Sequence, residues 1–316
     1  MQVLFVIIGA VLGLTYGSYY YGFVFSSKIC LFAGLTLIMP SLFNVKLQDI
    51  TLLWPHRRLI LKSLVLNYLL LPLFAVGIAL VSGDFGIGAG VFLLSVLSGG
   101  GMVMHWIKKS AADTSLGFLI LFMNLTLVTL SLLMLHLYGV YGAGYFDASY
   151  DDKTNVSNFA NAVIVLLIVI PFIASRVVLW IKPLVEFITA YRSYISNISI
   201  LLIIFYLFGL QNSQQLFDLY DFEPELIGVA AVAVISFYIL VVIASFMFFD
   251  LNSPQERAAF WHSVTRYITL ALVISTFTTY TFGISMLLPI MMAYLVQIPF
   301  SMLIEKKIEK DLNSVS

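Results

Sequence analysis

Long runs of apolar residues restrict the fold of this chain more than any other feature of its sequence. Turn-forming or charged residues bound these runs. A helix of about 20 apolar residues crosses a hydrocarbon core of about 30 Å. Hydrophobic residues make up 61% of the 316 residues and charged residues only 10%, against roughly a quarter charged in an ordinary soluble domain. The alternating segments of a membrane β-barrel are not seen in the sequence. The sequence therefore predicts an all-α, polytopic integral membrane protein.

Hydropathy, together with breaks at charges, prolines and glycines, predicts ten membrane-spanning helices. The second of them is short and is interrupted by Pro40. The predicted spans are 3–20, 29–45, 57–81, 86–109, 114–140, 159–182, 192–211, 226–249, 255–280 and 283–305.

Charged residues separate by sign across these spans. Cytoplasmic loops collect Lys and Arg, and most of the basic residues fall on one side. They are Lys46, Arg57, Arg58, Lys62, Lys108, Lys109, Arg176, Lys182, Arg192, Arg257, Lys306, Lys307 and Lys310. The opposite loops are acidic, with Asp84, Asp147, Asp151, Asp152, Asp218, Asp221, Glu223 and Glu225. Both termini are therefore expected on the cytoplasmic side.

The longest polar connection, GAGYFDASYDDKTNVSN, divides the ten helices into two sets of five. Because five is odd, the second set must have the opposite topology, as in the inverted repeats of secondary transporters. The predicted segments are a first five-helix repeat at 1–141, an extracytoplasmic connecting loop at 142–158, a second, inverted repeat at 159–308 and a cytoplasmic tail at 309–316.

The fourth span of each half carries an interruption near its middle. In VLSGGGMVMHW the three residues 99–101 are glycines, each of which lowers helix stability by about 1 kcal/mol relative to alanine. The second interruption is FWHSVTRYITLALVIS, with Ser263, Thr265, Arg266 and Thr269. Unwound segments survive in hydrocarbon only inside protein or beside a watery cavity, and transporters place their substrate sites there. We expect the two breaks to face each other across a hydrated pocket; the alternative is that the glycines only allow close helix packing.

Several motifs resemble those of the bile acid:sodium symporter superfamily, which includes arsenite-efflux permeases and bacterial organic-anion symporters. They are LTLIMPSLFNVKLQDI, LNYLLLPLFAVGIAL and SGGGMVMHWIKKSAADTSL, whereas MVMHW, Asn124 and YLVQIP resemble the arsenite branch in particular. The resemblance implies a core domain that contains two broken, crossing helices and alternates against a panel domain built from the first two helices of each half. Together with the charge distribution it implies a bacterial inner (plasma) membrane.

The sodium ligands of that family have no counterpart in this chain. Its symporters carry a serine–asparagine pair in the first broken helix, and this pair falls on Val103 and Met104. Their glutamate and glutamine–asparagine motif falls on residues 261–267, which contain no carboxylate. The cysteine of the arsenite permeases falls on Gly99, and their final-helix glutamate is replaced by Gln297. No metal site and no thiolate chemistry are therefore expected.

Arg266 is the one basic residue predicted in the middle of a span. A charge near the bilayer midplane costs at least about 2.5 kcal/mol on insertion scales, and such residues usually act in transport. Arginine also stays protonated. We hypothesise that Arg266 stands where sodium would sit, and either holds the crossover together or receives an anionic substrate. The alternative is that it snorkels or belongs to a loop.

His105 is the second candidate, because histidine titrates near neutral pH and suits proton coupling. The alternative is an interfacial position beside Trp106 and Lys108. His56 and His262 look interfacial, and no role is assigned to them.

These features predict a secondary active transporter, related to symporters, that moves a small organic anion by alternating access without sodium. The candidate substrate-binding residues are Ser98, Gly99, Gly100, Gly101, His105, Asn124, Thr265, Arg266 and Thr269. The alternatives are a transport-inactive sensor or scaffold and an arsenite-type efflux permease. The sequence has no metal-ligand pattern, nucleophile elbow or phosphate-binding loop. An enzyme, a cofactor and a nucleic-acid partner are therefore not expected; the expected partners are a small solute and the lipid bilayer.

Overall fold

A computed structural model describes residues 2–20, 28–33, 35–36, 39–43, 54–100, 102–150, 165–213 and 224–315. In this described part the regular structure is helical apart from one isolated β-bridge. The chain forms two compact units, and each unit combines two separate stretches of sequence. Unit 1 consists of Met1–Asn44 and Ser157–Pro224, and unit 2 of Val45–Val156 and Glu225–Ser316. Unit 1 thus holds nearly all of the first two predicted helices of each half, and unit 2 holds the other three.

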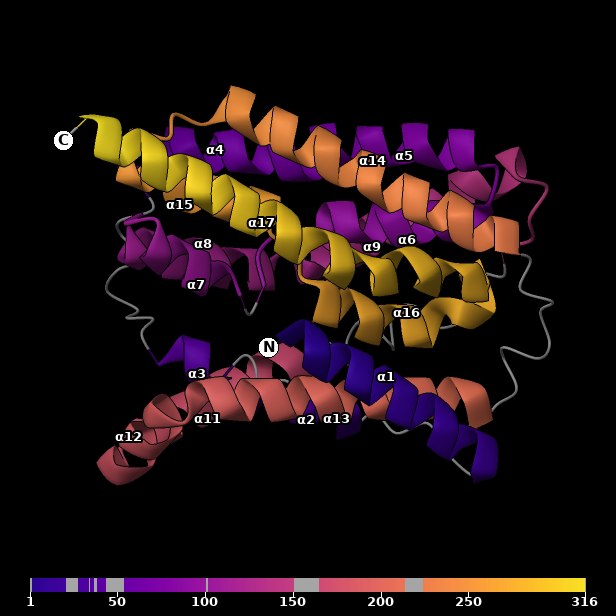
Figure 1. The fold of residues 1–316 in the computed structure, drawn as a ribbon, viewed down its shortest axis with the longest axis horizontal. Helices are drawn as coiled ribbons and strands as arrows, with labels where there is room; N and C mark the ends of the chain where they lie inside the picture. Colours follow the sequence, from indigo (N-terminus) through magenta and orange to yellow (C-terminus); the bar gives the residue numbers. More distant parts are fainter. Residues whose placement is uncertain are drawn as a thin grey trace. The chain divides into compact units, whose positions relative to one another are not determined.

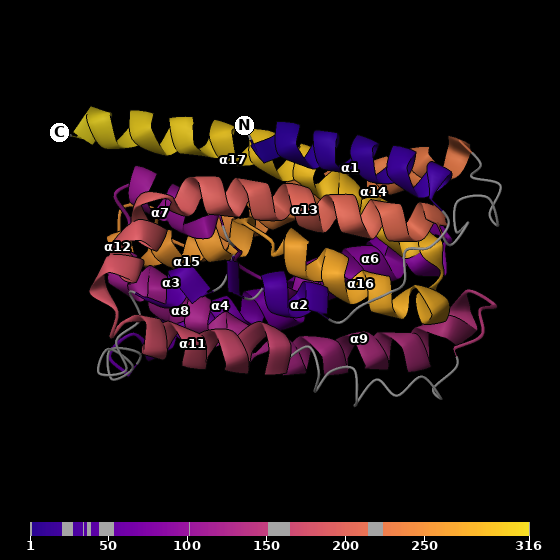
Figure 2. The ribbon, with the colours of Figure 1, turned by 90° about the horizontal axis from the view of Figure 1, so that it is seen from below.

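Unit 1 is built around the pairing of its first and last helices. Figure 2 shows α1 (Gln2–Tyr19) alongside α13 (Arg192–Ser213), and Tyr16 of α1 packs against Phe205 of α13 with ring centroids 5.5 Å apart. The shorter elements are α2 (Lys28–Ala33), α3 (Met39–Leu42), the π-helical η5 (Val165–Val169), α11 (Ile170–Val178) and α12 (Lys182–Ala190). Arg176 ties α11 to α3 by donating to the carbonyl oxygen of Leu42 at 2.7 Å.

The helix α12 corrects the sequence prediction, which left a connection between spans ending at 182 and starting at 192. It begins at a proline-containing first turn, and none of its residues is buried. Hydropathy missed it because its apolar residues cover only one face, and a span is recognised by a continuous apolar run.

Unit 2 contains the longest apolar helices. Its elements are α4 (Arg57–Val65), π-helical η3 (Leu66–Leu70), α5 (Leu71–Ser82), α6 (Phe85–Val96), α7 (Val103–Lys109), α8 (Thr114–Thr126), α9 (Val128–Gly142), η4 (Ala143–Tyr145), α14 (Pro224–Phe248), α15 (Pro254–Val264), α16 (Ile268–Phe282), η6 (Ile284–Met286) and α17 (Leu287–Val315). The final helix therefore includes most of the residues predicted as a tail at 309–316.

Local sequence explains where several of these helices begin. The Asp84 carboxylate accepts from the amide of Ile87 at 2.6 Å, and that of Asp113 accepts from Leu116 at 3.0 Å. The Ser253 hydroxyl accepts from the amide of Glu256, with a proline in the first turn of α15. These are ordinary N-caps, which satisfy amides that the helix leaves free.

The helix α6 is the centre of unit 2. All twelve of its residues are buried, and α5, α9, α16 and α17 pack around it (Figure 1). In both views α7 and α15 lie together at one end of unit 2, and α6 and α16 lie together towards the other (Figures 1 and 2). A helix buried all round can be apolar on every side, which matches its sequence.

Three described helices are long and apolar enough to cross a membrane: Arg57–Ser82, Glu225–Phe248 and Leu287–Lys310. A fourth span is possible if Thr114–Thr126 and Val128–Tyr145, bent by 46° at the break between them, count as one. These helices confirm an integral membrane protein. The ten spans and the inverted repeat stay predictions.

Candidate functional site

The two predicted interruptions are present, and their backbones contact each other directly. Residues 97–102 separate α6 from α7, and residues 265–267 separate α15 from α16. The amide of Gly99 donates to the carbonyl oxygens of His262 (2.9 Å) and Thr265 (2.8 Å), and the amide of Tyr267 donates to Leu97 (2.9 Å). Ser98 and Arg266 form an antiparallel β-bridge. We call this junction of residues 97–100 and 265–267 the crossover.

This contact corrects the expectation of a hydrated pocket between the breaks. An unpaired backbone group in hydrocarbon costs several kcal/mol. In the crossover each break supplies hydrogen-bond partners for the other, so several freed amides and carbonyls are already satisfied by protein. A substrate therefore has to be recognised by the side chains around the junction rather than by these backbone groups.

This close approach leaves little room for a side chain at two of the glycines. Gly99 has a φ of +75°, and a Cβ there would lie 2.7 Å from Nδ1 of His262. At Gly100 a Cβ would lie 3.1 Å from the carbonyl oxygen of Arg266. The predicted site residue Gly101 lies outside the described residues. The geometry at Gly99 and Gly100 supports an interruption over the simpler reading of helix packing.

Arg266 is a buried cation held by neutral oxygens. Its side chain is 2% exposed, which excludes a snorkelling or loop position. Nη1 donates to the carbonyl oxygen of Ser95 at 3.0 Å, and Nη2 donates to Oδ1 of Asn67 at 2.8 Å and to the carbonyl oxygen of Ser263. In the described part of the chain the two ion pairs are Lys62–Glu256 and Lys109–Glu305. Arg266 therefore crosslinks η3, α6 and α15 with no carboxylate partner among the described residues.

Asn67 is oriented for this role by its own contacts. Its amide nitrogen donates to the carbonyl oxygen of Ser63 (2.8 Å) and to the hydroxyl of Ser263 (3.1 Å), which turns Oδ1 towards Arg266. Asn67 lies in the π-helical turn η3, just before Pro72. Proline has no amide hydrogen to donate to the preceding turn, and π-helical turns are frequent at functional sites.

Gln297 of α17 fixes the second break from the other side. Its Oε1 accepts from the backbone amide of Arg266 at 2.6 Å and from the hydroxyl of Tyr238 on α14 at 2.8 Å. Gln297 is 2% exposed. A neutral amide oxygen thus stands where the arsenite permeases are expected to carry a carboxylate.

His262 adjoins the crossover, although the sequence analysis placed it at the interface. It is fully buried, and its Nε2 lies 2.8 Å from the carbonyl oxygen of Gly117. A carbonyl only accepts, so Nε2 carries the hydrogen. Nδ1, which lies 3.4 Å from Nδ2 of Asn124, is then the acceptor. The imidazole is therefore neutral in this arrangement.

The structure brings most of the predicted residues together. Ser98, Gly99, Gly100, Thr265 and Arg266 form the crossover, and Asn124 contacts it through His262. Thr269 lies in the first turn of α16, where its hydroxyl pairs with that of Tyr294 at 2.6 Å.

His105 does not join this group. It is exposed on α7, with its ring edge-on to Trp106 at 5.1 Å between centroids. Replacing His105 with glutamine should leave stability within about 0.5 kcal/mol of the original, as expected for surface positions. Transport measured between pH 5.5 and 8.5 should also keep its profile, because the His105 ring is exposed on α7 and packs edge-on against Trp106 rather than against a residue of the crossover. A moved pH midpoint would restore the proton-coupling hypothesis for His105.

Four residues that hold the crossover were not among the predicted site residues: Asn67, Ser95, His262 and Gln297. Asn67 and Gln297 did leave a signal, because a lone amide in a long apolar helix needs a partner. Ser95 acts through its backbone carbonyl, which any residue supplies.

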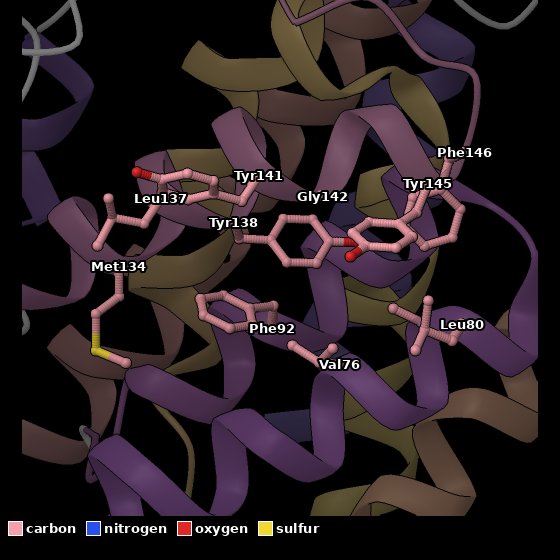
Figure 3. Close-up of a pocket in the computed structure, with 11 residues that line it drawn as sticks. Val76, Leu80, Phe92, Met134, Leu137, Tyr138, Tyr141, Gly142, Tyr145 and Phe146 are labelled. Carbon is pink, nitrogen blue, oxygen red and sulfur yellow. The ribbon is translucent and has the colours of Figure 1, made fainter.

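One cavity of unit 2 lies away from the crossover residues. It has a volume of about 430 Å³ and is bounded by α5, α6, α9 and η4, with Phe92, Tyr138 and Tyr145 among its walls (Figure 3). Figure 3 shows the rings of Tyr138 and Phe92 facing this space, and no lining residue carries a charge. None of the predicted site residues lines it, so it has no evident means of selecting an anion.

Comparison with known proteins and families gives a family match for this chain. A comparison with curated proteins gives no match. A family model described as "Sodium Bile acid symporter family" matches residues 31–216, more than half of the chain. The match includes the first break and ends before α15 and α16, so Arg266 lies beyond it. Members of this family are transporters rather than enzymes. The chain belongs to the sodium bile acid symporter family.

Proposed function

We propose that this protein is a secondary carrier for a small organic anion, and that Arg266 replaces the sodium ion of its relatives. The observation that carries the proposal is the buried guanidinium at the crossover, bound to three neutral oxygens and to no described carboxylate. Neutral carbonyl and amide oxygens are ligands of the kind that hard metal cations take. A permanent cation among them supplies the positive charge that a bound ion would otherwise bring.

Two unused donors support an anionic substrate. Nε of Arg266 and the hydroxyl of Ser98 are buried and have no hydrogen-bond partner. Residues opposite each other in an antiparallel bridge place their side chains on the same face, with Cβ atoms about 5 Å apart. A carboxylate or sulfonate that reached this face would accept from both donors, and charged acceptors form the stronger hydrogen bonds.

The division into units supports alternating access. In this proposal unit 2, which contains the crossover, is the core, and unit 1 is the panel. Movement of one rigid unit against the other carries the crossover between the two faces of the membrane, as in carriers with broken helices. The inverted repeat, the ten spans, the inner-membrane location and the cytoplasmic termini belong to the same proposal.

Sodium independence is the direct test. The full-length protein is reconstituted in liposomes, and uptake of radiolabelled pyruvate, benzenesulfonate and taurocholate is measured with sodium or choline as the external cation. These monoanions of strong acids do not cross bilayers readily as neutral acids. We expect initial rates that agree within about twofold in the two media, since a fixed guanidinium is protonated at any working pH. A strict sodium requirement would contradict the role given to Arg266.

Binding and flux separate the alternatives. An anion that raises the melting temperature of the protein without being transported would favour the sensor or scaffold, because a ligand of the native state stabilises it whether or not it is moved. The arsenite-type alternative has less support, since the position of the arsenite-permease cysteine is Gly99, where a Cβ would meet His262.

A further inference from the structure

The crossover carries a net positive charge that it cannot release. Arg266 stays protonated, and the described ion pairs leave it without a carboxylate. Tyr267 of the crossover is an uncharged phenol, and the adjoining His262 is neutral in the arrangement shown by its contacts with Gly117 and Asn124. Tyr238, which contacts Gln297, is an uncharged phenol. The charge of the empty crossover is therefore +1.

A monoanion at the crossover cancels this charge. The free donors of Ser98 and Arg266 are the groups that would donate hydrogen bonds to it. The loaded core is then neutral, whereas the empty core is a buried cation. Moving one elementary charge across the whole of a 100 mV potential shifts a distribution by about 50-fold, and passage of an uncompensated charge through a low-dielectric region is disfavoured as well.

We infer that this protein is an anion exchanger, in which the core changes sides much more readily with an anion bound than without one. The inference rests on the proposed function and adds its transport mode. A sodium-coupled relative releases its cations with the substrate and returns without their charge. This chain retains the charge of Arg266 through the whole cycle, so the return step is fast only when a second anion is carried back.

The test compares exchange with net uptake in the same proteoliposomes. Labelled pyruvate, benzenesulfonate or taurocholate is added outside vesicles that contain either the same unlabelled anion or none. We expect exchange to be at least about 10-fold faster than net uptake, the ratio that corresponds to a barrier difference of about 1.4 kcal/mol. With the potential clamped by potassium and valinomycin, a negative interior should slow net uptake, because the empty core must return outward with its positive charge. Exchange of a monoanion should not respond to the potential.

Variants of Arg266 test whether its charge causes the preference for exchange over net uptake. Arg266→Lys keeps a cation, so the ratio of exchange to net uptake should stay high even if both rates fall. Any flux that remains in Arg266→Gln should show a ratio near one. Arg257→Gln is the matched control, since Arg257 is also a buried arginine of the α15 span, 4% exposed, whose Nη2 donates to the carbonyl of Ala111 rather than to the crossover. Its ratio should equal that of the unmodified protein.

The outcomes are distinguishable. Equal exchange and net rates in the unmodified protein would overturn the exchanger and leave the carrier intact. Absence of flux in both modes, with all three anions, would overturn the proposed function itself. If Arg266→Gln does not fold, the potential dependence of the unmodified protein and the Arg266→Lys ratio still decide the question.

Discussion

Replacing Arg266 with alanine will abolish anion transport and destabilise the protein, and free guanidinium will restore part of both. The change removes donors from the carbonyls of Ser95 and Ser263 and from Oδ1 of Asn67, all inside unit 2. A buried acceptor left without its donor costs about 1–3 kcal/mol, so we expect a total loss of about 3–5 kcal/mol. For a chain of this size that corresponds to a fall in melting temperature on the order of 10 °C.

The rescue distinguishes charge from packing. Guanidinium at about 20 mM places a planar cation in the vacated space and should raise the melting temperature of Arg266→Ala. Urea has the same shape without the charge, and at the same concentration it should not. Sodium chloride should also stabilise the variant relative to choline chloride, because the three freed oxygens are suitable ligands for a hard cation. The melting temperature of the unmodified protein should be the same in sodium chloride and in choline chloride, since the guanidinium of Arg266 fills the site.

Arg257→Ala is the control for this experiment. It also removes a buried arginine, but one whose contact is the carbonyl oxygen of Ala111. Guanidinium should not change anion transport in this variant. If Arg266→Ala transported anions at the original rate without rescue, both the cation-replacement proposal and the exchanger would lose their basis.

The interruptions were predictable because their signals are local. Three glycines in sequence disfavour a helix wherever they occur, and a polar run inside an apolar span needs protein partners. Ser253 and Pro254 form a standard N-terminal helix signal at the start of α15. Local chemistry thus located both breaks to within a few residues.

The contact between the breaks was not predictable in the same way. Gly99 donates to residues more than 160 positions away, and no periodicity in one segment specifies which backbone it approaches. His262 was misplaced for a related reason. It follows Glu256 and Arg257 closely in sequence, which suggests a membrane interface, but two turns into α15 it is fully buried. Whether a residue near the end of a membrane-spanning helix is buried depends on which other helices pack against it, and a single sequence does not show that.

Gly99→Ala is expected to destabilise the protein and to impair transport, and Gly83→Ala provides its matched control. Both glycines have positive φ, +75° at Gly99 and +69° at Gly83. At Gly83 a Cβ would meet nothing within 4 Å, whereas at Gly99 it would lie 2.7 Å from Nδ1 of His262. The left-handed backbone costs a non-glycine residue about 1–2 kcal/mol, and this should be the whole effect at Gly83. Gly99→Ala adds an overpacking cost of about 1–3 kcal/mol.

Melting temperatures of the detergent-purified variants measure this difference, at roughly 2–4 °C for each kcal/mol. Transport should fall far more in Gly99→Ala than in Gly83→Ala, because the methyl group pushes the two breaks apart where Gly99 donates to His262 and Thr265. Equal losses of melting temperature and transport in the two variants would mean that the close approach of Gly99 to His262 does not contribute to stability.

A double substitution identifies the contact responsible. His262→Ala removes the ring that the new methyl group would strike, at the cost of the hydrogen bond to the carbonyl oxygen of Gly117. If the clash with Nδ1 is the cause, the loss in Gly99→Ala/His262→Ala should be smaller than the sum of the two single losses by about 1–3 kcal/mol. Additive losses would locate the damage in the backbone of Gly99 alone. A cysteine at position 99, as expected in the arsenite permeases, would bring the same Cβ against His262. The absence of a side chain at position 99 and the buried imidazole of His262 therefore depend on each other.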